Sequence, residues 1–150
     1  MDLLLAIDDL DSSAFTIDQV ASRPWPEGTR VEVLSVVKEI VPPLPAPMDD
    51  SAALAIGAMQ TQNRLLDVAS AMVSEVSERL KRSGLSARPV VRTGDAAAEI
   101  LDEAARSKAD LIIVGDSGRS RFERRLLGST AQTVVSRAPC SVEVIRRKAS

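Results

Sequence analysis

The chain has 150 residues, which is the size of a single domain with a full hydrophobic core. It is 45% hydrophobic and 27% charged, as globular proteins are, and its net charge of −2 gives no overall attraction to nucleic acids or anionic membranes. It contains no histidine and one cysteine, which excludes a Ser-His-Asp triad, a Cys-His dyad, a histidine-based zinc site and an intrachain disulfide.

The first elements are a strand, a helix and a second strand. Leu3–Ile7 is a short apolar run that two aspartates follow, which is typical of a strand buried on both faces. This run is too short for a signal peptide or a membrane span and has no basic leader, so we expect a cytoplasmic protein. Ser12 and Ser13 are expected to cap a helix that ends near Ser22, and the β-branched residues of Val31–Val37 predict the second strand.

A proline-rich segment and a long helix come next. Residues 39–50 contain four prolines, so we expect an exposed loop there. The sequence then predicts a helix from Ser51 to Ser83. Its core-facing stripe has helical spacing and consists of Leu65, Ala69, Met72, Val73, Val76 and Leu80.

The second half of the chain repeats the alternation. Strands are predicted at Ala87–Arg92, Leu111–Val114 and Ser141–Arg147, and helices within Gly94–Asp110 and at Ser129–Arg137. The order βαβαβαβαβ predicts one α/β domain with a parallel sheet and helices on both faces, because right-handed crossovers carry the helices out of the sheet. The two most apolar strands, the first and the fourth, are expected at its centre.

A ligand site is expected where these two strands end, because open α/β sheets bind ligands at the carboxyl ends of their strands. The segment GDSGRSRFERRLLGST begins there, at Gly115. Its glycines leave room for backbone amides to approach a ligand, and Ser129 with Gln132 fits a capping box at the start of a helix, where phosphate binds well. Arginines add positive charge at positions 119, 121, 124 and 125. The residues alone therefore predict an anion site, with a solvated glycine turn as the alternative.

The same segment resembles the nucleotide-binding motif of the universal stress protein family, G-x2-G-x9-G-[ST]. Gly115, Gly118, Gly128 and Ser129 occupy its fixed positions. LLLAIDDLDSS is similar to the opening strand of that family, GDAAAEILDEAARSKADLIIVG to its third helix and fourth strand, and APCSVEVIRR to its closing strand. The resemblance extends over nearly the whole chain except the proline-rich loop, and it favours the ATP-binding branch of the family.

This resemblance implies a universal stress protein domain over residues 1–150, with a Rossmann-like fold of the adenine nucleotide alpha hydrolase type and strand order 3-2-1-4-5. It implies bound ATP, with Mg²⁺ or Mn²⁺ for which the sequence shows no protein ligand set. It also implies a homodimer formed by antiparallel pairing of the fifth strands, with Val142 and Val144 at the interface. Carried over by position, the nucleotide-binding residues are Ala6, Ile7, Asp8, Val36, Gly115, Ser117, Gly118, Gly128, Ser129 and Thr130, to which we add Arg119 for its charge.

Two positions depart from the family pattern. Asp116 stands where a small or hydroxyl residue is usual, and a carboxylate there repels phosphate unless a metal or an arginine offsets it. Ala96 replaces a proline at the start of the third helix. The tail from Arg146 to Lys148 is expected to be solvated.

Function is expected to be regulatory. Because no general base is apparent, we predict a nucleotide-dependent homodimer that acts in the stress response through a protein partner. The alternatives are slow ATP hydrolysis or phosphotransfer, and a dimeric adaptor without nucleotide. Asp8, Asp9 and Asp11 could instead bind Mg²⁺ as in phospho-acceptor receiver domains, which would also require Asp116 and Lys148.

Overall fold

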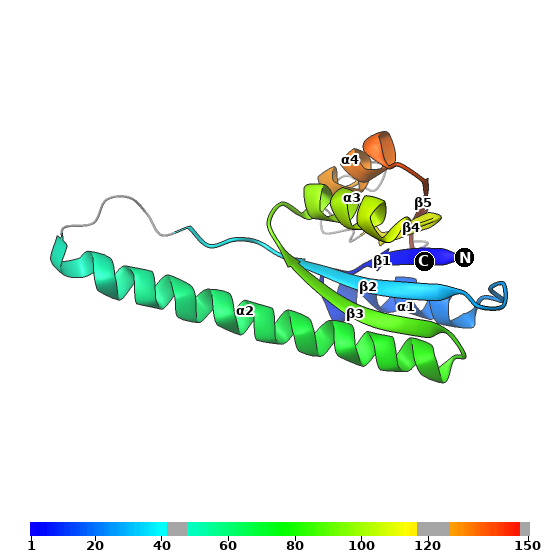
Figure 1. Ribbon diagram of the computed structural model, residues 1–150, viewed down its shortest axis with the longest axis horizontal. Coiled ribbons are helices and arrows are strands. Elements are labelled where there is room, and N and C mark those ends of the chain that lie inside the picture. The colour runs from blue at the N-terminus through cyan, green and yellow to red at the C-terminus, as the bar shows by residue number, and fades with distance from the viewer. Residues whose placement is uncertain (42–47, 117–126, 148–150) are drawn as a thin grey trace.

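Strands and helices alternate along the chain, as the sequence predicts. The computed structural model describes residues 1–41, 48–116 and 127–147 (Figure 1). In chain order the elements are β1 (Asp2–Ala6), α1 (Leu10–Ser22), β2 (Arg30–Val37), α2 (Met48–Arg82), β3 (Ser86–Thr93), α3 (Ala96–Ser107), β4 (Leu111–Gly115), α4 (Ser129–Arg137) and β5 (Ser141–Ile145).

All strand pairs of the five-stranded sheet are parallel, in the order β3-β2-β1-β4-β5. Leu5 of β1 lies opposite Val33 of β2 on one side and Ile113 of β4 on the other. The apolar strands β1 and β4 are therefore central, because each has a strand on both sides. This confirms the predicted single α/β domain and its strand order.

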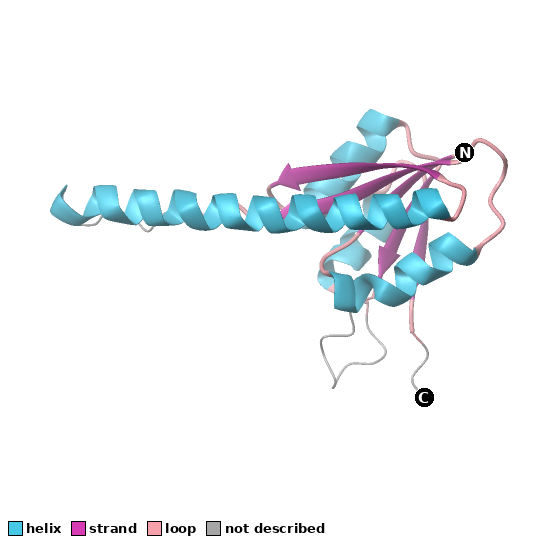
Figure 2. Ribbon diagram, turned by 90° about the horizontal axis from the view of Figure 1, so that it is seen from below, coloured by secondary structure: helices cyan, strands magenta, loops and turns pink. Residues whose placement is uncertain are grey.

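Helices cover both faces of the sheet and bury a hydrophobic cluster on each. α1 and α2 lie on one face, and α3 and α4 on the other (Figures 1 and 2). Alternate residues of a strand point to opposite faces, so Leu3 and Leu5 of β1 join the cluster under α1 and α2, while Leu4 joins the cluster under α3 and α4. Such strands must be apolar throughout, which explains the uninterrupted run in β1.

The cap of α1 differs from the prediction. Its N-cap is Asp9, whose Oδ1 accepts a hydrogen bond from the Ser12 amide at 2.8 Å, and whose Oδ2 accepts one from the Ser12 hydroxyl at 2.7 Å. Ser12 and Ser13 therefore lie inside the helix and do not cap it. An aspartate at the N-cap also brings negative charge to the positive end of the helix dipole.

The long helix also differs from the prediction at its beginning. α2 begins at Met48, so positions 48–50 of the expected loop are helical, whereas residues 42–47 lie outside the described part. Leu65 was expected in the core stripe but is 42% exposed, and the first buried residue of the stripe is Ala69. The amino-terminal half of α2 extends past the sheet, so it has no strand to cover it (Figure 1). None of the described helices has the length and hydropathy needed to cross a membrane.

A buried carboxylate anchors α3 to β3. Glu103 is 2% exposed, and its Oε2 accepts hydrogen bonds from Arg92 of β3 at 2.6 Å and from Arg106 of α3 at 2.5 Å. Burial alone would raise the pKa of Glu103, but the hydrogen bonds and positive charges of the two arginines outweigh it, so this pKa lies below its usual value. The pairing holds α3 beside the carboxyl ends of β2 and β3.

Candidate functional site

A pocket opens at the carboxyl ends of the central strands, where the sequence predicts a site. The ends of β1, β2 and β4, the first turns of α1 and α3, and the start of α4 all contribute to it. The lining residues are Ala6, Ile7, Asp8, Ser12, Ser13, Leu34, Val36, Ala96, Ile100, Val114, Gly115, Asp116, Gly128, Ser129, Thr130 and Ala131.

The structure brings the described members of the predicted nucleotide-binding set together. Residues lining this one pocket are Ala6, Ile7, Asp8, Val36, Gly115, Gly128, Ser129 and Thr130. Ser117, Gly118 and Arg119 lie outside the described residues. Leu34 and Ile100 were missed, although the sequence contains a signal for both. Leu34 is two positions before Val36 on the same face of β2, and Ile100 is one helical turn after Ala96.

One wall of the pocket is apolar. Leu34 and Ile100 are buried, Val36 is partly buried, and the three belong to the cluster between the sheet and α3. The Ile7 amide already donates a hydrogen bond to the Leu34 carbonyl oxygen at 2.9 Å, so it is not free to bind a ligand. This wall presents carbon atoms and few polar groups, which suits the face of a flat aromatic ring.

Another part of the pocket lining is the beginning of α4. Its N-cap is Gly128, with φ −57° and ψ 152°, and no side chain caps the helix. The predicted capping box is therefore wrong, because Ser129 is the first helical residue. The first i→i−4 bond runs from the Gln132 amide to the Gly128 carbonyl oxygen at 2.9 Å, so the amides of Ser129 and Thr130 precede the helical ladder. Such amides, together with the helix dipole, bind anions.

The two glycines at the pocket differ in their surroundings. A Cβ at Gly115 would lie 2.7 Å from Oγ1 of Thr16, a buried residue of α1. A Cβ at Gly128 would meet no atom of the described residues within 4 Å. Gly115 is therefore required by the packing of α1 against β4, whereas the fold places no such demand on Gly128.

Asp116 is mostly buried and is paired with an arginine. Its Oδ2 lies 2.8 Å from Nε of Arg146, and its amide donates to the Ile145 carbonyl oxygen at 3.0 Å. Arg146 and Arg147 are exposed, as the predicted solvated tail requires, but Arg146 is also fixed by this ion pair, which the sequence did not predict. This arginine is the partner that a carboxylate near a phosphate site requires.

The arrangement does not favour the receiver-type magnesium site. Asp9 caps α1, and Asp116 is paired with Arg146, while Lys148 lies outside the described part of the chain. Among residues 1–41, 48–116 and 127–147, no three His, Cys, Asp or Glu side chains are grouped so that they could hold a metal ion.

Comparisons with protein families and curated proteins agree with the motif. A model of the universal stress protein family matches residues 1–146. The universal stress protein YxiE of Bacillus subtilis is 25% identical over 96% of this chain and 97% of its own length. Universal stress protein A homolog 2 of Coxiella burnetii is 36% identical over 61% of each chain. The match spans 44% of a relative from Methanocaldococcus jannaschii and 42% of one from Methanothermobacter thermautotrophicus, which is about half the length of each.

Solved structures share the fold at low sequence identity. The hypothetical protein MJ0577 of Methanocaldococcus jannaschii has a TM-score of 0.80 at 20% identity, with 99% of this chain and 97% of that chain covered. A universal stress protein family protein from Arabidopsis thaliana with AMP bound has a TM-score of 0.60 at 18% identity, covering 99% and 93%. A universal stress protein in complex with cAMP has a TM-score of 0.64 at 20% identity, covering 97% and 96%.

Proposed function

The chain belongs to the universal stress protein family, and from this we propose that it is a regulatory protein that binds ATP, or a related adenine nucleotide, in the pocket between β1 and β4. The adenine would lie on the apolar wall at Val36, and the phosphates would lie at Gly128, Ser129 and Thr130. Ser117, Gly118 and Arg119 complete the proposed site.

One observation carries this proposal most directly. The pocket joins an apolar wall to an uncapped helix start, and these are the two surfaces that an aromatic base bearing a phosphate needs. The Arabidopsis protein with bound AMP and the protein in complex with cAMP support the ligand class. Mg²⁺ or Mn²⁺ would enter with the phosphates, because the described residues offer no cluster of ligands for it.

Identification of the bound molecule tests this proposal. Freshly purified protein is denatured, and any released small molecule is identified by chromatography with mass detection. We expect near-stoichiometric adenine nucleotide. If the protein is empty, it is titrated with magnesium-ATP, and a failure to bind at millimolar ligand would leave the nucleotide-free adaptor as the better account.

The ion pair at Asp116 is expected to control the affinity for phosphate. Arg146→Gln removes the positive charge beside Asp116, so we expect ATP to bind roughly tenfold more weakly, with adenosine unaffected. Asp116→Asn in the same chain should restore the affinity, because it removes the repelling charge. Calorimetric titration of both variants with the two ligands measures this, and equal losses for ATP and adenosine would contradict it.

We also propose a homodimer through the edge strand β5. Val142 and Val144 are partly exposed on β5, and Glu143 between them is paired with Arg23 at 2.6 and 2.7 Å. An exposed edge strand is a surface on which a second strand can pair. Val144→Lys is expected to give a monomer in sedimentation with an unchanged circular dichroism spectrum, and an unchanged dimer would rule out this interface.

A further inference from the structure

The backbone groups that β5 presents at its open edge can be assigned. Among the described strands none lies beyond β5. The Asp116 amide donates to the Ile145 carbonyl oxygen at 3.0 Å, so Ile145 turns its backbone groups toward β4. This direction alternates along a strand, so Glu143 also faces β4, whereas Val142 and Val144 present their N–H and C=O groups at the edge. Only these two residues of β5 can bond a further strand.

These groups determine the register in which two β5 strands can pair. The inference rests on the proposed homodimer, in which β5 pairs antiparallel with β5 of a second copy. The whole strand is used when Val142 faces Val144 of the second copy and Val144 faces Val142, and each of these pairs exchanges two hydrogen bonds. A shift by two residues leaves one such pair within β5, and a shift by one sets outward-facing groups against inward-facing ones. The two-fold axis of the dimer therefore passes at Glu143.

At this axis Glu143 of one copy lies directly opposite Glu143 of the other. The two residues form a pair without mutual hydrogen bonds, in which the Cα atoms are about 4.5 Å apart and the side chains are closest. Both carboxylates lie on the α1 side of the sheet, because Val142 and Val144 contact the cluster under α3 and α4. Like charges directly opposite each other destabilise a strand pair. Pairing of β5 with itself therefore requires a positive charge beside Glu143.

Arg23, the C-cap of α1, supplies this charge. Its Nη1 donates to Oε2 of Glu143 at 2.7 Å, and its Nη2 donates to Oε1 at 2.6 Å. These hydrogen bonds hold the pKa of Glu143 below its usual value, so the carboxylate is charged at neutral pH. The guanidinium also lies over the ring of Trp25, 5.5 Å from its centre, and Trp25 Nε1 donates to the Val20 carbonyl oxygen at 2.8 Å. Arg23 is therefore already held in place in the single chain.

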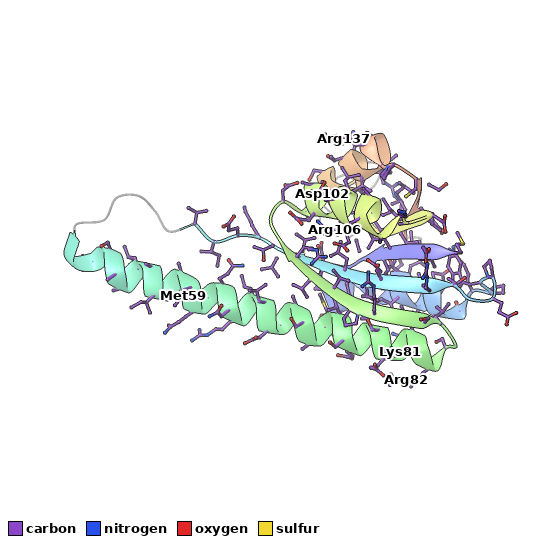
Figure 3. All side chains as sticks on the ribbon, viewed as in Figure 1. Met59, Lys81, Arg82, Asp102, Arg106 and Arg137 are labelled. Carbon is purple, nitrogen blue, oxygen red and sulfur yellow. The ribbon has the colours of Figure 1, made fainter. Side chains whose placement is uncertain are left out.

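Basic side chains of the other helices lie away from Glu143. Arg137 is at the end of α4, on the opposite face of the sheet (Figure 3). Lys81 and Arg82 are at the end of α2, which packs chiefly on β2 and β3 and so lies toward the other edge of the sheet (Figure 3). Among the described residues, Arg23 is the one that pairs with Glu143.

We propose that Arg23 controls the self-association of β5, because it neutralises Glu143 at the two-fold axis. In the dimer, the two copies of this ion pair form a cluster of two arginines and two glutamates with no net charge. A guanidinium has five N–H groups, and Arg23 uses two of them on its own Glu143. The remaining donors are available to Glu143 of the second copy, and hydrogen bonds between charged groups are the stronger kind.

Removal of the arginine tests this role in the full-length chain. Arg23→Gln is expected to lower the association constant at least fivefold in sedimentation equilibrium, and Glu143→Gln in the same chain should restore it. Raising the salt concentration from about 0.05 M to about 0.5 M should recover much of the loss in Arg23→Gln, because salt screens the repulsion between the two carboxylates. The matched control is Arg30→Gln, which removes an ion pair of 2.6 Å with Asp2 on strands away from the β5 edge, and it should leave association unchanged.

Val144→Lys separates a failure of this role from a failure of the dimer. If Val144→Lys gives a monomer and Arg23→Gln associates as the wild type does, the β5 dimer stands and the role of Arg23 is overturned. If Arg23→Gln weakens association but Glu143→Gln does not restore it, Arg23 acts through packing and not through its charge, which also overturns the proposal. A monomeric wild-type chain would overturn both the dimer and the role of Arg23.

Cysteine cross-linking tests the position of the axis. In a Cys140→Ser background, Glu143→Cys should form covalent dimers on mild oxidation, because Cα atoms about 4.5 Å apart fit a disulfide. The matched control is Ser141→Cys. In this register the two copies of position 141 lie four residues apart along the strands, about 13 Å, which is too far for a disulfide, so at least tenfold fewer covalent dimers should form. Equal yields from the two variants would overturn the register.

Discussion

Gly115→Ala is expected to lower the free energy of unfolding by about 1–3 kcal/mol, which is the usual cost of overpacking a core. The added Cβ would lie 2.7 Å from Thr16 Oγ1, and Thr16 is buried in α1, so it has little room to move away. Either α1 must shift away from β4 or Thr16 must change its rotamer. Urea denaturation monitored by circular dichroism measures the loss.

The control for this prediction is a double-mutant cycle with Thr16→Ala. That substitution removes the Oγ1 atom in the clash, so Gly115→Ala should cost less than half as much in the Thr16→Ala background as in the wild type. Equal costs in both backgrounds would show that contact with Thr16 is not what requires glycine at position 115.

Gly128→Ala is expected to behave in the opposite way. No atom of the described residues lies within 4 Å of the new Cβ, and φ at Gly128 is −57°, so the free energy of unfolding should change by less than about 0.5 kcal/mol. Binding of ATP or AMP should weaken at least tenfold, because the methyl group would stand where we propose that phosphate approaches the first amides of α4. Calorimetric titration measures the affinity.

Adenosine provides the ligand control for Gly128→Ala. It has the base and the ribose but no phosphate, so its affinity should be the same in the variant and in the wild type. If ATP binds the variant as tightly as the wild type, the phosphates do not lie at the start of α4. If adenosine and ATP lose affinity equally, the substitution has altered the pocket as a whole.

Much of the fold could be predicted from the sequence, because the signals involved are local. The apolar runs of β1 and β4 predicted buried central strands, and the alternation of strands and helices predicted a parallel sheet. The exposure of Leu65 could not be predicted from such local signals. Helical spacing identifies a stripe on α2, but it does not say where the sheet beneath that stripe stops.

The errors at helix starts have a different cause. Asp9, Ser12 and Ser13 can all accept a hydrogen bond from an amide, and only the backbone conformation decides that Asp9 is the N-cap of α1. At α4, the sequence at Ser129 fits a capping box, but Ser129 is the first residue of the helix and not its N-cap. The amides of the first helical turn therefore have no capping side chain, and Ser129 and Thr130 line the pocket.

The parts of the candidate site that lie at strand ends or at the glycines of the motif could be predicted from the sequence. Asp8, Val36 and Gly128 come from distant parts of the chain, and the order of the strands brings them to one pocket. The pairing of Asp116 with Arg146 could not be predicted in this way, because no periodicity relates two residues on neighbouring strand ends thirty positions apart.

A titration of isotope-labelled protein with AMP, followed by nuclear magnetic resonance of the backbone amides, tests the central claim most directly. We expect the largest shifts at Ser129 and Thr130, with further shifts at Asp8 and Val36. Adenosine should shift the signals of Asp8 and Val36 and leave those of α4 nearly unchanged. Shifts confined to residues outside this pocket, or none at millimolar AMP, would contradict the proposal that an adenine nucleotide binds between β1 and β4.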